Sequence, residues 1–167
     1  MPRPTIVIKS VANLSTEAMR RIEALVTLGD EVENEDLDQR LARCQKIAIA
    51  KVGDELTCTA ALKAARPWKN ASVSKMSGFT LSDDAVEFGY VVTHPEFRQQ
   101  GMARDLCAKI LETIKGNLYA TVRSDNDSMR RILESNGFVK AGHAWASRQP
   151  DKSLNLWIRE SISAEDV

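Results

Sequence analysis

The chain has 167 residues, 43% hydrophobic and 28% charged, which predicts one folded domain spanning residues 1–167. Lysine and arginine together number 23, and so do aspartate and glutamate, so a nucleic-acid-binding protein, which usually carries a basic excess, is not expected. No apolar run reaches the roughly 20 residues that cross a bilayer, and the N-terminus does not resemble a signal peptide. The three cysteines, Cys44, Cys58 and Cys107, have neither disulfide nor zinc spacing. We therefore expect a cytoplasmic protein with reduced, buried thiols, no metal and no membrane partner.

Hydrophobic periodicity, capping residues and turn residues predict a series of strands and helices. Strands are expected at residues 5–9, 45–52, 55–65, 85–93, 117–123, 138–146 and 153–159. Helices are expected from a Ser15 cap to about residue 28, and then around residues 37–44, 101–115 and 126–136. The polar segment 66–82 contains Pro67 and Gly78 and is expected to be a long loop. The order β-α-α-β-β-β-α-β-α-β-β predicts an α/β fold with a mixed sheet and helices on both faces.

The stretch from Val91 to Ala103 carries the clearest chemical signal. A β-type run ends at Pro95, and the pattern Arg-x-x-Gly-x-Ala begins at Arg98 and leads directly into an amphipathic helix. The start of a helix has unpaired N–H groups and a partial positive charge, which together bind phosphate, and Gly101 lets the backbone approach closely. Arg98 is expected either to contact the phosphate or to brace the loop.

The phosphate-binding residues predicted in this way are Arg98, Gln99, Gln100, Gly101, Met102, Ala103 and Arg104. Neither the glycine pattern of a dinucleotide fold nor that of a P-loop is present. A phosphorylated cofactor of another kind is therefore expected.

The loop resembles the acetyl-CoA pyrophosphate loop of the GCN5-related N-acetyltransferase (GNAT) family, which reads Gln/Arg-x-x-Gly-x-Gly/Ala. Asn126, a following helix and then Asn136-Gly137-Phe138 form a second family feature at the right distance. The resemblance implies that the cofactor is acetyl-CoA and that the main chain of Val91, Val92 and Thr93 pairs with its pantetheine arm. It also implies that Asn126 contacts the cofactor near the thioester, although asparagine at this position equally suits a helix N-cap.

Glu87 is the expected general base. It lies on the strand that leads into the loop, on the same face as Gly89, Val91 and Thr93. The histone-acetyltransferase branch of the family carries its glutamate base at this spacing. The alternative is a solvent-exposed glutamate at a sheet edge. The N–H of Val91 is expected to polarise the thioester carbonyl. Many family members have a proton-donating tyrosine where this chain has Leu133, which leaves the general acid open between Ser128, Tyr119 and solvent.

These features predict an N-acetyltransferase that moves an acetyl group from acetyl-CoA to a primary amine of a small molecule or peptide, by direct attack in a ternary complex. The alternatives are a non-catalytic acyl-CoA-binding regulatory module, which Leu133 leaves open, and a mononucleotide-binding α/β protein that binds ATP. In the family, the connection corresponding to the acidic segment 30–38 borders the acceptor groove. The segment is expected either to attract a cationic amine or to be a solvated helix start. A homodimer is compatible with the sequence.

Overall fold

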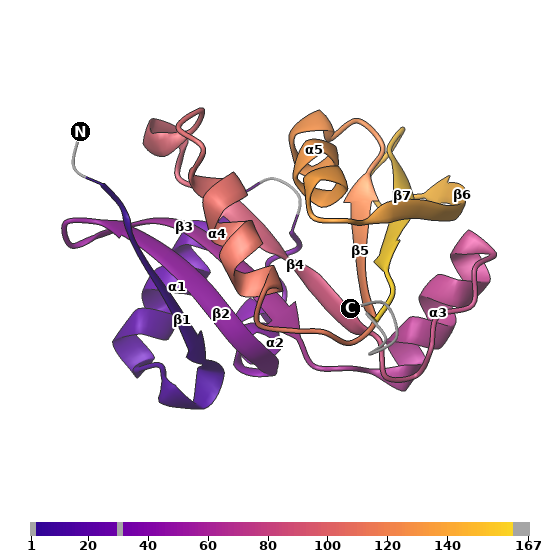
Figure 1. Ribbon diagram of the computed structural model, residues 1–167, viewed down its shortest axis with the longest axis horizontal. Coiled ribbons are helices and arrows are strands. Elements are labelled where there is room, and N and C mark those ends of the chain that lie inside the picture. The colour runs from indigo at the N-terminus through magenta and orange to yellow at the C-terminus, as the bar shows by residue number, and fades with distance from the viewer. Residues whose placement is uncertain (1–2, 30–31, 162–167) are drawn as a thin grey trace. The chain divides into compact units, whose positions relative to one another are not determined.

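The computed structural model describes residues 3–29 and 32–161 (Figure 1). The chain divides into two compact units, and each is built from two chain segments: residues 1–64 with 89–113, and residues 65–88 with 114–167. Strand β4 (Val86–Thr93) contributes its first three residues, 86–88, to the second unit and the remainder to the first. Across the described residues there are seven mostly antiparallel strands with helices, which confirms the predicted mixed α/β fold class.

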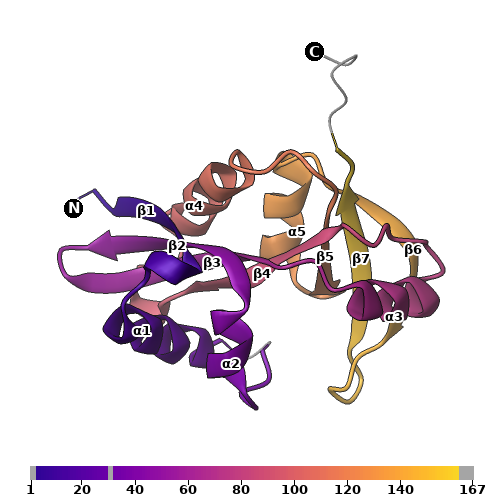
Figure 2. The same ribbon diagram turned by 90° about the horizontal axis from the view of Figure 1, so that it is seen from below.

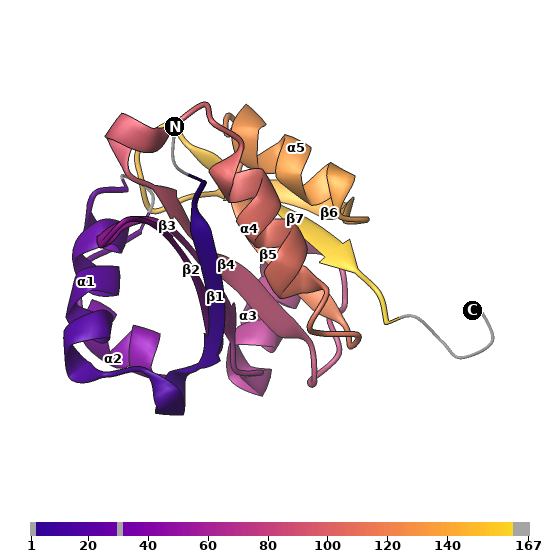
Figure 3. The ribbon, with the colours of Figure 1, turned by 60° about the vertical axis from the view of Figure 1, so that its left-hand side comes forward.

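The first unit is a layered arrangement of helices on both faces of a set of strands. Its elements are β1 (Thr5–Ser10), α1 (Thr16–Thr27), α2 (Leu37–Ala42), β2 (Cys44–Val52), β3 (Glu55–Lys63), the second part of β4, the short 3-10 helices η1 (Val11–Asn13) and η2 (Pro95–Phe97), and α4 (Met102–Leu111). The strand order is β1-β2-β3-β4, and β2 pairs antiparallel with both β1 and β3. Figure 2 and Figure 3 show α1 and α2 on one face of these strands and α4 on the other.

Local sequence signals explain how this unit forms. Ser15 caps α1 as predicted, because its Oγ accepts a hydrogen bond from the N–H of Ala18 at 3.1 Å. Ile22 of α1 and Leu41 of α2 pack in one core with Ile49 of β2 and Val92 of β4. On the opposite face, α4 packs on β2 and β3, where fully buried small residues allow a close approach. These small residues include Ala48, Ala50, Cys58 and Ala60.

The second unit also has helices against strands. Its elements are α3 (Pro67–Ser77), the first part of β4, β5 (Leu118–Arg123), α5 (Asp127–Ser135), β6 (Val139–Ala146) and β7 (Ser153–Arg159). The strand order is β4-β5-β7-β6, in which β4 and β5 are parallel and the other neighbours antiparallel. Helix α3 lies along β6 and β7 (Figure 2), and Val73 of α3 packs with Tyr119, Leu156 and Ile158.

The loop predicted for residues 66–82 is wrong over most of its length, because Pro67–Ser77 is a helix. Pro67 occupies the first turn, where a missing N–H has no helical partner to lose, and Gly78 ends the helix in the left-handed conformation at φ 77°. The helix buries Val73, but it also buries the polar residues Asn70 and Ser77. An apolar stripe with helical spacing is therefore missing, and this stripe is what reveals a helix in a sequence.

All three cysteines are buried and free, as predicted for the thiols, although Cys44 begins β2 and does not extend the helix that ends at Ala42. Burial raises the pKa of the Cys58 and Cys107 thiols, so both stay protonated and unreactive at neutral pH. No helix within residues 3–29 and 32–161 is long and apolar enough to cross a membrane.

Candidate active site

Strand β4 is irregular at Tyr90, whose φ is +52°. A bulky residue in this conformation is uncommon, and such strained positions concentrate at functional sites. Tyr90 and Val92 are both buried in the core of the first unit. The predicted shared face of Glu87 and Val91 assumed a regular strand, so residue parity does not support it once Tyr90 interrupts the alternation.

The end of β4 is tied to the rest of the first unit. The N–H of His94 donates to the carbonyl of Thr57 at 2.7 Å, and Thr93 Oγ1 lies 3.3 Å from Cys58 Sγ. Arg98 Nε donates to the carbonyl of Thr93 at 3.3 Å. Arg98 therefore braces the loop, which is one of its two predicted roles. A pantetheine group that pairs with the Thr93 carbonyl has to share this acceptor with Arg98.

The loop before α4 has the geometry of an anion-binding nest. Gln99 and Gly101 are both left-handed, with φ of 64° and 77°, and such residues within a turn direct neighbouring N–H groups to one concave side. Gly101 is the N-cap of α4, and no side chain within the described residues caps this helix. The Arg104 Nη2 atom lies 3.0 Å from where a Cβ on Gly101 would be, which adds positive charge beside the loop. The loop therefore fits a phosphate group.

The side chains of the loop divide into anchored and exposed ones. Met102 is buried, and its sulfur accepts a hydrogen bond from Thr57 Oγ1 at 3.3 Å, so this side chain anchors the start of α4 and only its main chain is suited to an anion. Ala103 is half-buried, while Gln99, Gln100 and Arg104 are exposed. The loop thus combines a fixed backbone with polar side chains at the surface.

Glu87 lies in the second unit and is only 7% exposed. It is therefore not the solvent-exposed edge glutamate that the sequence also allowed. A buried carboxylate needs a compensating partner, and Arg66 Nη2 lies 3.4 Å from its Oε2. In the parallel pairing of β4 with β5, Glu87 stands opposite Tyr119.

One of the three candidates for the proton donor, Tyr119, is disfavoured by its surroundings. Burial, followed by the charge of Glu87, raises the pKa of the Tyr119 phenol well above its usual range, while the charge of Arg66 opposes this shift. Proton transfer from such a phenol to a departing thiolate is uphill. Leu133, which has the position of the family tyrosine, is fully buried and carries no proton to give. Ser128, which is exposed on α5, and solvent are the two remaining candidates.

Asn126 has the capping role that was one of its two predicted functions. Its Oδ1 accepts a hydrogen bond from the N–H of Met129 at 3.0 Å, at the start of α5. The Nδ2 group and the second lone pair of Oδ1 are not used by this cap.

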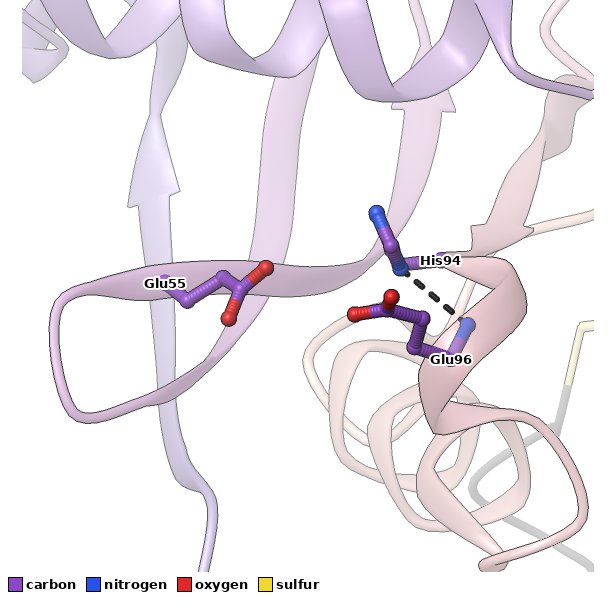
Figure 4. Close-up of side chains that lie close together, drawn as sticks. All are labelled: Glu55, His94 and Glu96. Carbon is purple, nitrogen blue, oxygen red and sulfur yellow. Dashed lines mark hydrogen bonds between the residues drawn. The ribbon is translucent and has the colours of Figure 1, made fainter.

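Glu55, His94 and Glu96 form a cluster that spacing did not reveal (Figure 4), with one potential ligand atom of each lying within 4.8 Å of the others. The residue types suit a divalent cation, but His94 Nδ1 already accepts a hydrogen bond from the N–H of Glu96 at 3.2 Å. A neutral imidazole with this hydrogen bond carries its proton on Nε2. The ring thus has no lone pair for a cation unless it gives up the hydrogen bond or the proton.

The acidic segment is described from residue 32 onward, and Asp30 and Glu31 lie outside the described residues. Arg40 Nη2 donates to the main-chain carbonyls of Glu33 and Glu35, which folds this segment onto α2. The residues Glu33 and Glu35 are themselves exposed. A nearby pocket between α1 and α2 is lined by Thr16, Met19, Arg20, Glu23, Asp38 and Leu41.

Comparison with protein families identifies the class of enzyme. A family model described as an acetyltransferase (GNAT) domain matches residues 10–139. The chain therefore belongs to the GNAT acetyltransferase family, which confirms the resemblance found in the loop and around Asn126. No curated protein sequence matches significantly.

Solved structures share the fold. The ribosomal-protein-S18-alanine N-acetyltransferase from Escherichia coli aligns with a TM-score of 0.70 and 14% identity, covering 98% of this chain and 99% of that one. Escherichia coli ElaA aligns with a TM-score of 0.69 and 17% identity, covering 95% and 100%. The structure of yncA from Salmonella typhimurium with its cofactor acetyl-CoA aligns with a TM-score of 0.63 and 15% identity, covering 96% of this chain and 95% of that one.

Proposed function

We propose that this enzyme transfers an acetyl group from acetyl-CoA to a primary amine of a small molecule or peptide. The observation that carries the proposal is the loop before α4, in which two left-handed residues and an uncapped helix start form an anion-binding nest in a chain of the GNAT acetyltransferase family. Acetyl-CoA in the yncA structure supports the same donor here. When bound, acetyl-CoA supplies an acetyl group on a thioester that a neutral amine attacks.

Different groups of this chain bind the cofactor, accept the proton and polarise the thioester carbonyl. The amides of residues 99–104 hold the pyrophosphate, and the main chain of residues 91–93 pairs with the pantetheine arm. The Glu87 carboxylate takes one proton from the acceptor ammonium, which frees the nitrogen lone pair. The N–H of Val91 donates to the carbonyl oxygen as negative charge develops there. As the N–C bond forms and the C–S bond breaks, the amine gives its second proton to solvent. The leaving sulfur gains a proton from solvent, either directly or through Ser128, which solvent then reprotonates.

An amine screen with purified protein tests the proposal. We expect thiol release from acetyl-CoA with at least one amine in a panel of polyamines, lysine-bearing peptides and aromatic amines. Acetyl-CoA binding without turnover on the whole panel supports the regulatory module. Binding of ATP without binding of coenzyme A supports the mononucleotide-binding alternative.

The buried free thiols suit a reducing compartment such as the cytoplasm, where we place the enzyme.

Replacing Gly101 with alanine is expected to raise the KM for acetyl-CoA by about tenfold, equivalent to about 1.4 kcal/mol. The new Cβ stands at the helix start where the phosphate has to approach the backbone, and it meets Arg104 Nη2 at 3.0 Å. Gly53→Ala is the matched control, since Gly53 is also left-handed at φ +61° but a Cβ there has nothing within 4 Å. Steady-state kinetics check the result. An equal rise in KM for both variants would contradict the phosphate site.

Reversing the charges of Glu33 and Glu35 with lysine is expected to raise the KM for a polyamine or a lysine-bearing peptide by about three- to tenfold at low salt. The physical reason is that exposed carboxylates near an acceptor groove raise the local concentration of cations. Glu134→Lys, an exposed reversal on α5, is the control. A KM that does not change in the double variant removes the acceptor role of the acidic segment.

A further inference from the structure

Glu55, His94 and Glu96 bring three acceptor groups together in the first unit (Figure 4). Glu55 is the first residue of β3, whereas His94 and Glu96 belong to the segment that follows β4. The Nδ1 atom of His94 accepts a hydrogen bond from the N–H of Glu96, so this ring nitrogen carries a lone pair and no proton. One imidazole and two carboxylates therefore meet without a donor side chain among them.

The backbone and the packing around His94 hold this residue in place. Its N–H donates to the carbonyl of Thr57 at 2.7 Å, which ties the end of β4 to β3 two residues from Glu55. Its ring lies edge-on to the ring of Phe97, with 5.8 Å between the ring centres and 71° between the ring planes. The imidazole thus loses little freedom when it binds a ligand.

The charges of the two glutamates are not compensated by the protein. Within residues 3–29 and 32–161, neither the Glu55 nor the Glu96 carboxylate forms an ion pair or accepts a hydrogen bond. His94 does not neutralise them in this arrangement, because its Nδ1 acts as an acceptor. Like charges so close together repel each other, and a cation between them removes the repulsion.

We propose that Glu55, His94 and Glu96 bind a transition-metal dication of the Zn²⁺ type, with water as a fourth ligand. An imidazole nitrogen favours Zn²⁺ and its neighbours in the first transition row, whereas Mg²⁺ and Ca²⁺ prefer ligand sets made only of oxygen. The ion takes the place of the Glu96 N–H at Nδ1, so the ring gives up one exposed hydrogen bond and no proton.

The present geometry is close to what such an ion requires. Ligand atoms around a tetrahedral zinc ion are about 3.3 Å apart, and the three candidate ligand atoms lie within 4.8 Å of one another. Glu55 and Glu96 are both exposed, so their side chains can rotate to close this difference. The bound ion links the start of β3 to η2, directly before the phosphate-binding loop. The site lies outside the function proposed above and does not depend on it.

Calorimetric titration of the full-length chain with zinc chloride, after removal of any polyhistidine tag, tests the site. We expect one Zn²⁺ to bind per chain with a Kd of about 10 µM. At a free Zn²⁺ concentration about ten times the Kd, the melting temperature is expected to rise by about 3–6 °C. Magnesium chloride is expected to give neither effect. The three cysteines are buried and do not compete for the ion.

Glu55→Gln and His94→Gln are each expected to weaken Zn²⁺ binding by at least about tenfold, since even the outer partners of metal ligands contribute about 10- to 100-fold. Glu112→Gln and His143→Gln are the matched controls and are expected to bind Zn²⁺ like the wild type. Glu112 is an exposed carboxylate at the end of α4, and His143 is the other histidine of the chain and is also exposed. Melting temperatures without zinc check that all four variants are folded.

Three results overturn the site: no Zn²⁺ binding by the wild type, undiminished binding by Glu55→Gln and His94→Gln, or equal binding of Mg²⁺ and Zn²⁺. Binding that is lost in His143→Gln also overturns it, because the ion then occupies another place. The acetyl-transfer assay does not enter this test, so the zinc site and the proposed function can each fail without the other.

Discussion

Replacing Gly142 with alanine is expected to lower the melting temperature by about 5–15 °C, because among the glycines of this chain a Cβ at Gly142 makes the closest contact. Gly142 has a φ of +67°, and a Cβ there would overlap the carbonyl oxygen of Ser77 and lie 3.0 Å from its carbonyl carbon. Left-handed alanine costs about 1–2 kcal/mol, and overpacking adds about 1–3 kcal/mol. Both atoms of Ser77 belong to the backbone, so no side-chain rotation relieves the overlap.

Gly53→Ala isolates the two contributions. Gly53 is left-handed at φ +61° in the turn between β2 and β3, and a Cβ there meets nothing within 4 Å. This variant is expected to lose only the conformational part, a fall of about 2–6 °C. Thermal unfolding followed by circular dichroism checks both values. Equal falls in the two variants would mean that α3 does not pack against β6 as closely as the structure has it.

Gly142 also illustrates what strand patterns leave out. The sequence predicts a plain strand over residues 138–146, but the register of β6 against β7 shifts between Ala141 and Trp145. A glycine inside a strand pattern is a sign of a bulge or of a close backbone approach, and here it is both. What approaches is the end of α3, the helix that the sequence did not predict, so neither feature could be placed without the other.

The elements that the sequence predicts well have a signal contained within a few residues. The caps at Ser15 and Asn126 are formed as expected. Helix α3 is different, because its buried polar residue Asn70 is stabilised by distant partners: Nδ2 donates to the carbonyls of Ser82 and Ala85, each at 3.0 Å. Long-range contacts of this kind decide the local structure but leave no periodic pattern.

In the candidate site, too, local features could be predicted from the sequence and long-range contacts could not. The phosphate loop is continuous in sequence, and the glycine at its centre could be identified because its left-handed conformation is a local requirement. The face of Glu87 could not be derived, because the positive φ of Tyr90 breaks the alternation within β4. The pairing of Arg66 with Glu87 could not be derived either, since Arg66 precedes a helix that the sequence predicts to be a loop. Its signal, an arginine directly before Pro67, is recognisable only once that helix is known.

Glu87→Gln is expected to lower kcat/KM for the acceptor by about 10²- to 10⁴-fold at pH 7, the usual contribution of a general base. Glutamine keeps the shape of the side chain in its buried position but cannot take a proton from the ammonium. The KM for acetyl-CoA is expected to remain within about twofold of the wild type, because Glu87 is not part of the loop before α4. Initial-rate measurements with both substrates varied separate these effects.

Glu134→Gln is the matched control for this variant. Glu134 is also paired with an arginine, since its Oε1 lies 3.8 Å from Arg130 Nη1, but its side chain is 50% exposed on α5. Loss of its weak surface ion pair is expected to leave both kinetic constants unchanged. The melting temperature of Glu87→Gln is measured as well. If it is close to that of the wild type, the loss of rate in Glu87→Gln does not come from unfolding.

The pH dependence then distinguishes a base from a merely structural carboxylate. Without Glu87 the enzyme depends on amine that is already neutral in solution, and this fraction rises about tenfold per pH unit until the amine pKa of about 10. Glu87→Gln should therefore recover toward the wild-type rate between pH 7 and pH 9.5. Tyr119 cannot accept the ammonium proton in place of Glu87 at pH 7, because the raised pKa of Tyr119 keeps its phenol protonated. A loss of rate that is the same at every pH would assign Glu87 a structural role and move the proton acceptor elsewhere.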